Sequence, residues 1–183
     1  MKNIFFGFVL SLVSVTARAE ISYSMPSLEA GFKWSAMDGK NSDSNKQSLG
    51  YQFGGSLVFN FNEDFGLKTG LMYSERPFKF AVAGQSDITG KITYADILVH
   101  FMFKVEDYAG IYIGPSISTK IGDEVSIGKL TGVKSMVIPI TFGGQFKFNE
   151  MMGLNLFFET VAGDLSEDIT GSRGIGTNLM INF

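Results

Sequence analysis

The sequence lacks cysteine altogether, which excludes disulfide bonds and attachment to a membrane through a lipid-modified cysteine. Proline is rare, with four residues among 183, and histidine occurs once. Beyond the N-terminal segment there is no apolar run of ~18 residues, so we expect no membrane-spanning helix. The net charge is −3, and we expect no nucleic-acid partner, because such partners need a basic surface.

The first 19 residues follow the order of a secretory signal peptide. Lys2 precedes an apolar run at residues 4–15, and small residues follow this run. The run is too short for a spanning helix, which needs about 20 residues. We expect cleavage to leave residues 20–183 as one domain with a net charge of −5, because residues 1–19 carry two cations and no acid. The residues assigned to the cleavage site are Ala17, Ala19 and Glu20.

The composition points to strands. The sequence is 45% hydrophobic, with 18 Phe and 22 Gly, and it shows no helical periodicity. Phe and Gly in such a pattern favour strands whose two faces differ in bulk. Eight segments alternate with period two, each near the ~9 to 11 residues of a tilted transmembrane strand. They cover residues 28–37, 48–61, 65–75, 92–103, 108–119, 137–148, 153–162 and 174–183.

The two faces of these segments differ in charge as well as in size. Large apolar side chains crowd one face, and no charged residue falls on that face in any segment. A small closed barrel has little room inside, so its small and polar residues should point inward and its large apolar residues should face lipid. The alternative, a secreted lipocalin-like barrel with an apolar interior, would reverse this order. The polar residues assigned to the interior are Glu29, Lys33, Lys68, Asp96, His100, Lys147 and Glu159.

A weak internal repeat marks the short turns. The segments "FNFNEDFGL" (59–67) and "FKFNEMMGL" (146–154) share a motif, and "FMFKVEDYAG" (101–110) keeps part of it. Each has a strand end with paired aromatics, a tight polar turn and a strand start. Three short turns and four longer loops predict an all-β fold, an eight-stranded antiparallel up-and-down transmembrane β-barrel with both termini at the short-turn end. The longer, hydrophilic loops are expected at residues 38–47, 76–91, 120–136 and 163–173.

These features together resemble the small eight-stranded outer-membrane barrels of Gram-negative bacteria, of the OmpA and OmpX type within the porin-like outer-membrane β-barrel families. The resemblance covers the whole chain after the signal segment. It implies a place in the outer membrane, contact with its lipids, and insertion by the barrel-assembly machinery. In such families a last strand that ends in an aromatic residue resembles the signal read by that machinery. Here the resemblance assigns that signal to Leu179, Ile181 and Phe183.

Three classes of function remain open. A structural or surface-interaction barrel with a lumen filled by side chains is expected, with loops that carry any contact to an extracellular ligand. A small porin-like channel is the alternative. A lipid-modifying enzyme would need a His paired with a Ser and a carboxylate near the outer rim. The single histidine, His100, lies toward the other end of its segment, in the inward phase beside Asp96 and with no Ser two residues on. We therefore expect no catalytic residue, cofactor or metal.

The interior charges are expected to form a paired plug, because buried unpaired charges cost several kcal/mol each. Glu29, Lys68, His100 and Lys147 are expected nearer the short-turn end, and Lys33, Asp96 and Glu159 nearer the middle. The first and last strands are neighbours in a closed barrel, and Glu159 lies one strand further on. This arrangement makes Lys33 the most testable member of the plug.

Overall fold

The computed structural model describes residues 22–23, 26–40, 44–81, 87–106 and 108–183. The expected cleavage site at Ala17, Ala19 and Glu20 lies outside these residues. Among the residues that the structure describes, none forms a helix of the length and apolarity that a helical membrane crossing requires.

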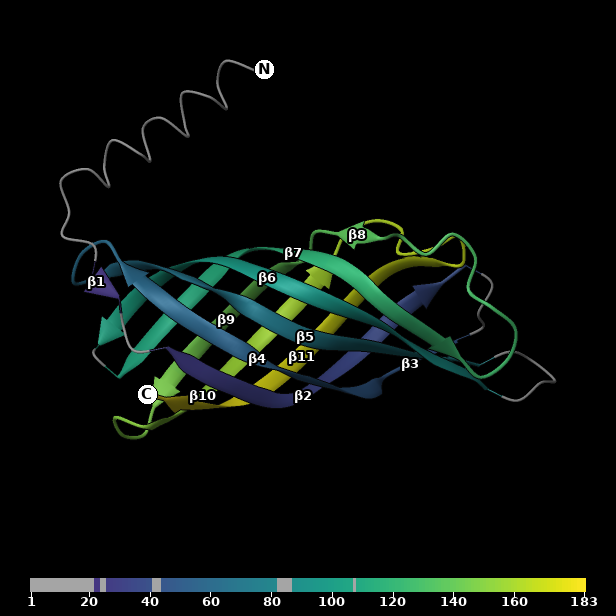
Figure 1. Cartoon of the computed structure of the whole chain (residues 1–183). Helices are drawn as coiled ribbons and strands as arrows, with labels where there is room; N and C mark the ends of the chain where they lie inside the picture. Colours follow the sequence, from purple (N-terminus) through teal and green to yellow (C-terminus); the bar gives the residue numbers. More distant parts are fainter. Residues whose placement is uncertain (1–21, 24–25, 41–43, 82–86, 107) are drawn as a thin grey trace, which may run out of the picture.

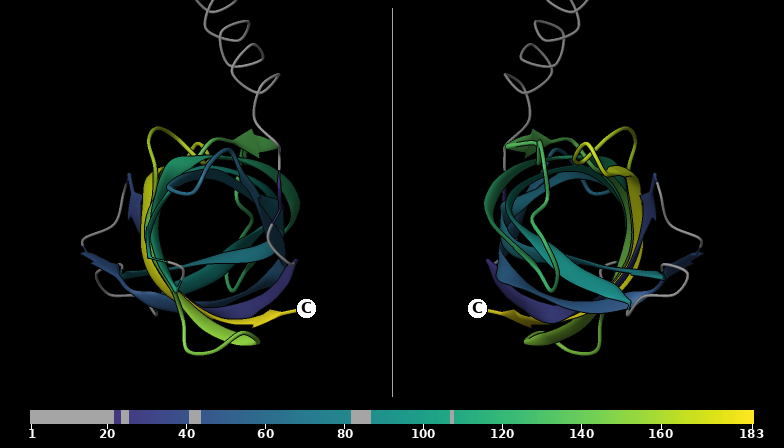
Figure 2. Two further views of the ribbon diagram at one scale, coloured as in Figure 1. Left: turned by 90° about the vertical axis from the view of Figure 1, so that its left-hand side faces the viewer. Right: turned by 90° about the vertical axis from the view of Figure 1, so that its right-hand side faces the viewer.

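Eight long strands form one antiparallel sheet that closes on itself, which confirms the expected fold (Figures 1 and 2). The order around the ring follows the chain, and the ring closes where the last strand pairs with the first over most of its length. The strands are β2 (Ser27–Gly39), β4 (Ser48–Asn60), β5 (Phe65–Ala81), β6 (Ile88–Glu106), β7 (Ala109–Val125), β9 (Ile140–Lys147), β10 (Met152–Val161) and β11 (Ile169–Asn182).

Three short strands add to the ends of this barrel. The first, β1 (Ser22–Tyr23), pairs with β4 near the short turns. At the opposite end β3 (Ser44–Lys46) pairs with β5, and β8 (Met136–Val137) pairs with β7. We call the end where β4 is followed by β5, β6 by β7 and β9 by β10 the turn end, and the opposite end the loop end.

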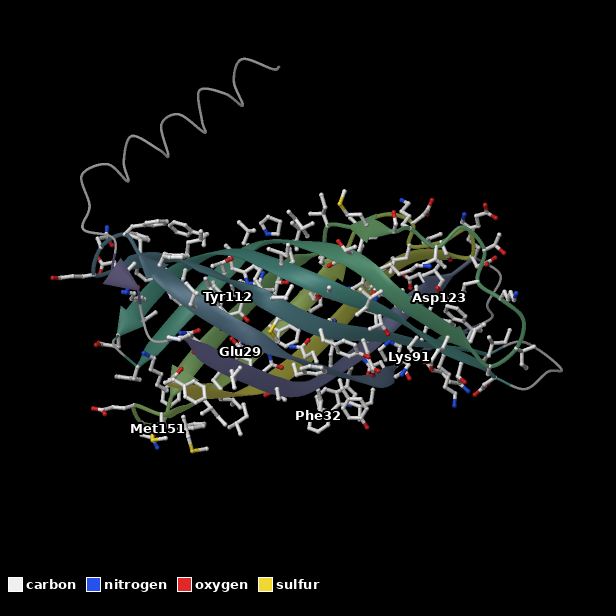
Figure 3. The ribbon with its side chains drawn as sticks, in the orientation of Figure 1. Glu29, Phe32, Lys91, Tyr112, Asp123 and Met151 are labelled. Carbon is white, nitrogen blue, oxygen red and sulfur yellow. The ribbon has the colours of Figure 1, made fainter. Side chains whose placement is uncertain are left out.

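The wall separates large apolar side chains from small and polar ones, as expected for a barrel in lipid. Leu71, Ile113 and Ile175 are more than half exposed on the outside, whereas Glu29, Lys33 and other polar residues are buried inside. Figure 3 shows Phe32 pointing away from the wall. Two inward glycines make room for large neighbours, since a methyl group at Gly143 would overlap the Tyr112 hydroxyl and one at Gly176 would overlap the Phe157 ring. The outer wall therefore supplies the hydrophobic surface, and the interior is packed with mixed side chains.

The turn end is built by two copies of one hydrogen-bonded turn. The side-chain oxygen of Asn62 accepts from the backbone N–H groups of Asp64 and Phe65, at 3.0 and 2.7 Å. Asn149, the equivalent residue of the repeat, accepts from the N–H groups of Met151 and Met152, at 2.9 and 2.8 Å. The sequence repeat thus encodes a turn in which an Asn side chain takes the place of a backbone acceptor.

At the loop end the prediction of four long loops is partly wrong. Residues 76–81 and 88–91 belong to β5 and β6, and residues 120–125 belong to β7, so these strands run well past the predicted ends. Figure 1 shows β5, β6 and β7 reaching far toward the loop end. Phe78 and Ile92 are buried inside this extension, at 1% and 0% exposure, while Lys79 and Lys91 lie on the outer face. The two faces therefore exchange character along β5 and β6, with apolar residues inside the extension rather than outside it.

Candidate functional site: the filled lumen

Two layers of polar side chains cross the lumen, and each is built around buried ion pairs. Six ionised groups occupy the two layers, and their three carboxylates face three cations. Because taking a charge out of water costs several kcal/mol unless it is paired, such a balance is what a closed interior requires. The six residues are Glu29, Asp96, Glu159, Lys33, Lys68 and Arg76.

The layer nearer the turn end centres on Glu29, which is 2% exposed. Lys68 on β5 places its Nζ 2.7 Å from Glu29 Oε1. The Nδ2 groups of Asn155 and Asn178 donate to Glu29 Oε2 at 2.8 and 3.1 Å, and the Ser56 hydroxyl donates to Oε1. Side chains from four strands thereby meet at a carboxylate on a fifth, and both of its oxygens are satisfied. We call this group the turn-side layer.

Aromatic contacts support the cation of the turn-side layer. Lys68 Nζ lies 5.0 Å from the centre of the Tyr112 ring, a cation–π distance. His100 stacks on the same ring with 5.1 Å between centroids, and the Tyr112 hydroxyl donates to Asn155 Oδ1 at 2.6 Å. Figure 3 shows Glu29 and Tyr112 within the body of the barrel, away from both ends. These contacts fix the position of the Tyr112 ring beside Lys68.

The layer nearer the loop end centres on Arg76, which is fully buried. Arg76 Nε and Nη2 donate to the two oxygens of Glu159 at 2.9 Å each, a bidentate pair. Its Nη2 also donates to Asp96 Oδ2 at 3.1 Å, and Lys33 Nζ donates to Glu159 Oε1 at 3.2 Å and to the Ser74 hydroxyl at 2.6 Å. We call this group the loop-side layer, and a single guanidinium joins both of its carboxylates.

A cluster of buried apolar side chains lies next to the loop-side layer, on the side of the loop end. The Tyr94 ring covers the Arg76 guanidinium at 4.6 Å and belongs to this cluster, which we call the apolar cap. The loops that complete the cap are tied together, because the backbone N–H of Lys134 donates to Leu165 O at 2.8 Å and that of Glu167 donates to Thr131 O at 3.0 Å. The apolar cap consists of Met37, Phe78, Phe80, Ile92, Tyr94, Val137, Val161, Leu165 and Ile169.

Little open space remains within the layers. A cavity of about 30 Å³ lies among Lys68, His100, Thr141 and their neighbours, which is room for only a few water molecules. At the turn end a wider hollow of about 290 Å³ is lined by Lys104, Lys147 and other residues. The hollow at the turn end is therefore much larger than the cavity beside the turn-side layer.

The predicted interior residues fall into three groups. Glu29 and Lys68 meet in the turn-side layer, whereas Lys33, Asp96 and Glu159 meet in the loop-side layer. His100 lies beside the turn-side layer, where its Nε2 is 3.1 Å from the Ser116 hydroxyl. Lys147 is only half-buried in the hollow at the turn end, and within the described residues no ion pair links it to either layer.

The sequence prediction missed Arg76 and the apolar cap. Arg76 precedes a proline and lies within residues 76–91, which are predicted to form a loop. It was therefore not counted among the inward-facing residues of a strand. Pro77 is instead part of β5, opposite Lys91 of β6. The signal that could have revealed it is the alternation of Arg76, Phe78 and Phe80 with Glu75, Pro77 and Lys79, which continues the period of the strand.

The chemistry available to these residues is limited by burial. The contact between Ser116 and His100 has the residue types of a nucleophile and its base, but their exposed fractions are 1% and 3%. Both side chains point into the packed lumen, and the Asp96 carboxylate pairs with Arg76 rather than with His100. Within the described residues no group of three or more potential ligands could hold a metal ion.

The outer face of the loop end carries ion pairs that are exposed or partly buried. Lys46 and Lys79 both contact Asp87 Oδ2, at 2.9 and 3.1 Å, and their hydrogen bonds lower the pKa of Asp87 below its usual value. Lys91 donates to Glu75 at 2.9 Å, and this hydrogen bond raises the pKa of Lys91. Figure 3 shows Lys91 and Asp123 at the loop end and Met151 at the turn end. Exposed pairs such as those of Asp87 contribute little stability, because water screens their charges, so they mark a polar outer surface rather than a structural brace.

The residues of the predicted assembly signal lie on the outer face of β11 near the turn end. Leu179, Ile181 and Phe183 are 44%, 40% and 62% exposed, and the backbone N–H of Phe183 donates to Pro26 O at 3.2 Å. The strand that carries them closes the barrel against β2.

Comparison with known proteins identifies the type of barrel. Residues 12–161 match the family model of the outer membrane protein beta-barrel domain. No curated protein matches the sequence. Among solved structures, Neisserial surface protein A is similar, with 13% identity, a TM-score of 0.58, and coverage of 88% of this chain and 99% of that one.

Two further solved barrels are similar at a lower level. The attachment invasion locus protein Ail of Yersinia pestis has 15% identity and a TM-score of 0.46, with coverage of 86% of this chain and 99% of that one. OprG from Pseudomonas aeruginosa has 8% identity and a TM-score of 0.47, with coverage of 87% and 94%. At these identities the likenesses concern the fold alone, and the last two are too loose to support more.

Proposed function

The chain belongs to the outer membrane protein beta-barrel domain family, and we propose that it is a non-conducting member whose loop end forms a surface for contacts outside the cell. The observation that carries this proposal is that three features, here called closures, fill the lumen one after another. The turn-side layer, the loop-side layer and the apolar cap follow one another between the hollow at the turn end and the loops.

Each closure opposes ion flow for a different reason. The ionic layers hold their charges in fixed pairs, so a passing ion would have to break buried hydrogen bonds that have no replacement from water. The apolar cap offers no polar group to replace the hydration shell of an ion. The cavity of about 30 Å³ beside the turn-side layer holds at most a few water molecules. These features support a plug over the alternative of a small porin-like channel.

The loop end has the properties of a contact surface. Strands β5, β6 and β7 carry their hydrogen bonds beyond the apolar part of the wall, with registers that continue to Phe80–Ile88 and to Gly90–Val125. The backbone bonds between loops 126–135 and 162–168 hold the other side. A surface that is ordered before it meets a partner loses little conformational entropy on binding.

A lipid-modifying activity receives no support from the site. A lipid substrate lies against the outer wall, whereas His100 and Ser116 are buried within the lumen on the other side of that wall. We therefore propose that the pair is part of the packing around the turn-side layer.

Conductance measurements test the plug. Purified protein inserted into planar lipid bilayers should give no discrete current steps in molar KCl. A variant with loops 126–135 and 162–168 shortened by Gly-Ser links should still give none, because the two ionic layers remain below the lost cap. Regular, ion-selective steps from the natural protein would instead support the porin-like alternative.

Labelling in intact cells tests the orientation of the loop end. Because the sequence has no cysteine, a single introduced thiol is the only target for a membrane-impermeant maleimide. Lys129→Cys, in the exposed loop 126–135, should react in intact cells. Glu150→Cys, in an exposed turn at the turn end, should react only after the outer membrane is permeabilised. Labelling of Glu150→Cys alone in intact cells would contradict the proposed contact surface.

The assembly signal and the leader complete the proposal. We infer that residues 1–19 direct export, that Ala19 precedes the cleavage point, and that Leu179, Ile181 and Phe183 engage the barrel-assembly machinery. What supports the inferred assembly signal is the exposure of an unbroken apolar face on the strand that closes the ring. Outer-membrane lipids are the surroundings of that face in the finished barrel.

A further inference from the structure

A groove of about 400 Å³ lies on the outer wall near the loop end, away from the lumen. It crosses β2, β10 and β11, where most of the wall is crowded with large side chains. Its lining combines a guanidinium and an amide with aromatic and aliphatic groups. The residues that line it include Trp34, Ala36, Gln47, Phe158, Arg173 and Ile175.

Strand register explains both the hollow and its two kinds of lining. Phe158, Ile175 and Trp34 are successive cross-strand partners and form one apolar row across the three strands. The next row toward the loop end contains Arg173 opposite Ala36. Because alanine is small, the space between the Arg173 side chain and the row below stays open. The groove therefore has an apolar floor toward the membrane and a cation toward the loops.

The cation of the groove retains capacity for a second anion. Arg173 Nη2 contacts Asp38 Oδ1 at 3.1 Å, and both side chains are largely exposed, at 62% and 44%. A guanidinium has five donors in a planar fork that matches carboxylate and phosphate oxygens. One oxygen contact leaves most of this fork directed to the surroundings.

Trp34 indicates the level in the membrane at which the groove lies. It is the single tryptophan of the chain and is 46% exposed on the outer wall. Tryptophan is enriched where the apolar core of a membrane meets the headgroups, and here it borders the last apolar row below an exposed ion pair. The inference rests on the proposed orientation, in which the loop end faces outside the cell, so that this boundary belongs to the outer leaflet, which consists of phosphorylated glycolipid.

We propose that this groove binds one lipid A molecule of the outer leaflet. An acyl chain lies along Trp34, Ile175 and Phe158, and a glucosamine phosphate accepts hydrogen bonds from Arg173. The proposal rests on charge complementarity between the free part of the guanidinium and a phosphate, and on an apolar channel directly below it. Asp38 competes with the phosphate for the same guanidinium, so it limits affinity.

Fluorescence of Trp34 measures occupancy directly, because no other tryptophan contributes. Protein in zwitterionic detergent micelles is titrated with bisphosphorylated lipid A, with dephosphorylated lipid A, and with phosphatidylglycerol. We expect a saturable change in emission with lipid A and at least tenfold weaker binding of the other two. Equal affinity for phosphatidylglycerol, or a change that never saturates, would overturn the lipid A site in favour of general anionic or non-specific lipid contact.

Two variants with opposite expected effects on the affinity for lipid A distinguish binding at this site from a general effect of lost charge. Arg173→Gln should weaken binding of lipid A about tenfold, since a charge-assisted hydrogen bond contributes on the order of 1.5 kcal/mol. Asp38→Asn should strengthen it, because the competing carboxylate is removed. Lys79→Gln is the matched control, a loop-end lysine that contacts Asp87 outside the groove and should leave binding unchanged. Unaltered affinity in both Arg173→Gln and Asp38→Asn would refute the proposal.

Discussion

Replacing Arg76 by Met removes the cation that joins both carboxylates of the loop-side layer. Asp96 then loses its ion-pair partner, because in the described part of the chain it pairs with Arg76 alone. Glu159 keeps Lys33 at 3.2 Å. Methionine fills much of the space of the arginine stem and adds no polar group, so the change acts mainly on charge.

The magnitude follows from one uncompensated carboxylate. Breaking a buried ion pair by removal of one partner costs about 3–5 kcal/mol, so we expect Arg76→Met to lower the free energy of unfolding by about 4 kcal/mol. The double variant Arg76→Met/Asp96→Asn removes both charges and leaves Lys33 paired with Glu159. We expect it to recover at least half of the loss, although it contains one more substitution.

The assay is urea unfolding of the barrel refolded in phospholipid vesicles, with the heat-modifiable shift in gel migration as a second measure of the folded form. The outer wall is unchanged in both variants, so insertion into the vesicles should be retained. An unfolding midpoint of Arg76→Met equal to that of the natural protein, or a double variant no more stable than the single one, would show that the charges in this layer are not coupled as the distances imply.

Four further outcomes are expected. Lys33→Met should lower the free energy of unfolding less, by about 1–2 kcal/mol in the same urea assay, because Glu159 keeps its bidentate partner. Leu165→Ala, in the apolar cap, should cost about 3 kcal/mol, seen as a lower unfolding midpoint and faster cleavage of the loops by added protease. Phe183→Asp should reduce folded protein in the outer membrane and increase unfolded protein in the periplasm, measured by gel migration of the fractions; full insertion would show that the aromatic terminus is incidental. The intact mass of protein from outer membranes should correspond to a chain that starts at Glu20, and recovery of the uncleaved chain would contradict export by a cleaved leader.

The barrel and its strand positions could be predicted from the sequence because lipid and lumen impose opposite demands on alternate residues. The wall near the turn end follows this rule throughout, and the predicted segment 48–61 differs by one residue from β4. The Asn62 and Asn149 turns were equally visible, since a short polar motif specifies them locally. Counting residues along the strands also placed Glu29 nearer the turn end and Lys33 nearer the middle of the barrel.

The loop end could not be predicted in the same way because its solvent is different. Beyond Ser74 the outer face of β5 meets water and its inner face meets the apolar cap. The rule that large apolar residues face outward and polar residues face inward is therefore reversed there. Phe78 and Phe80 lie on the inner face, where the rule expects small or polar residues, and Pro77 has no backbone N–H to donate to a neighbouring strand. Pairing partners are also invisible in one sequence, since Arg76 meets Glu159 across a distance of 83 positions in the chain.

The exchange of faces along β5 also affects the chain before it reaches the membrane. One face of this strand runs from Leu71 and Tyr73 to Lys79, and the other runs from Lys68 to Phe78 and Phe80, so neither face is apolar over its full length. Aggregation through stacked sheets needs long matching apolar faces without charges. A β5 segment that has not yet paired is therefore apolar over only half of either face. The other half of each face carries a lysine. The same alternation that seals the finished barrel thus limits self-association of the exported, still unfolded chain.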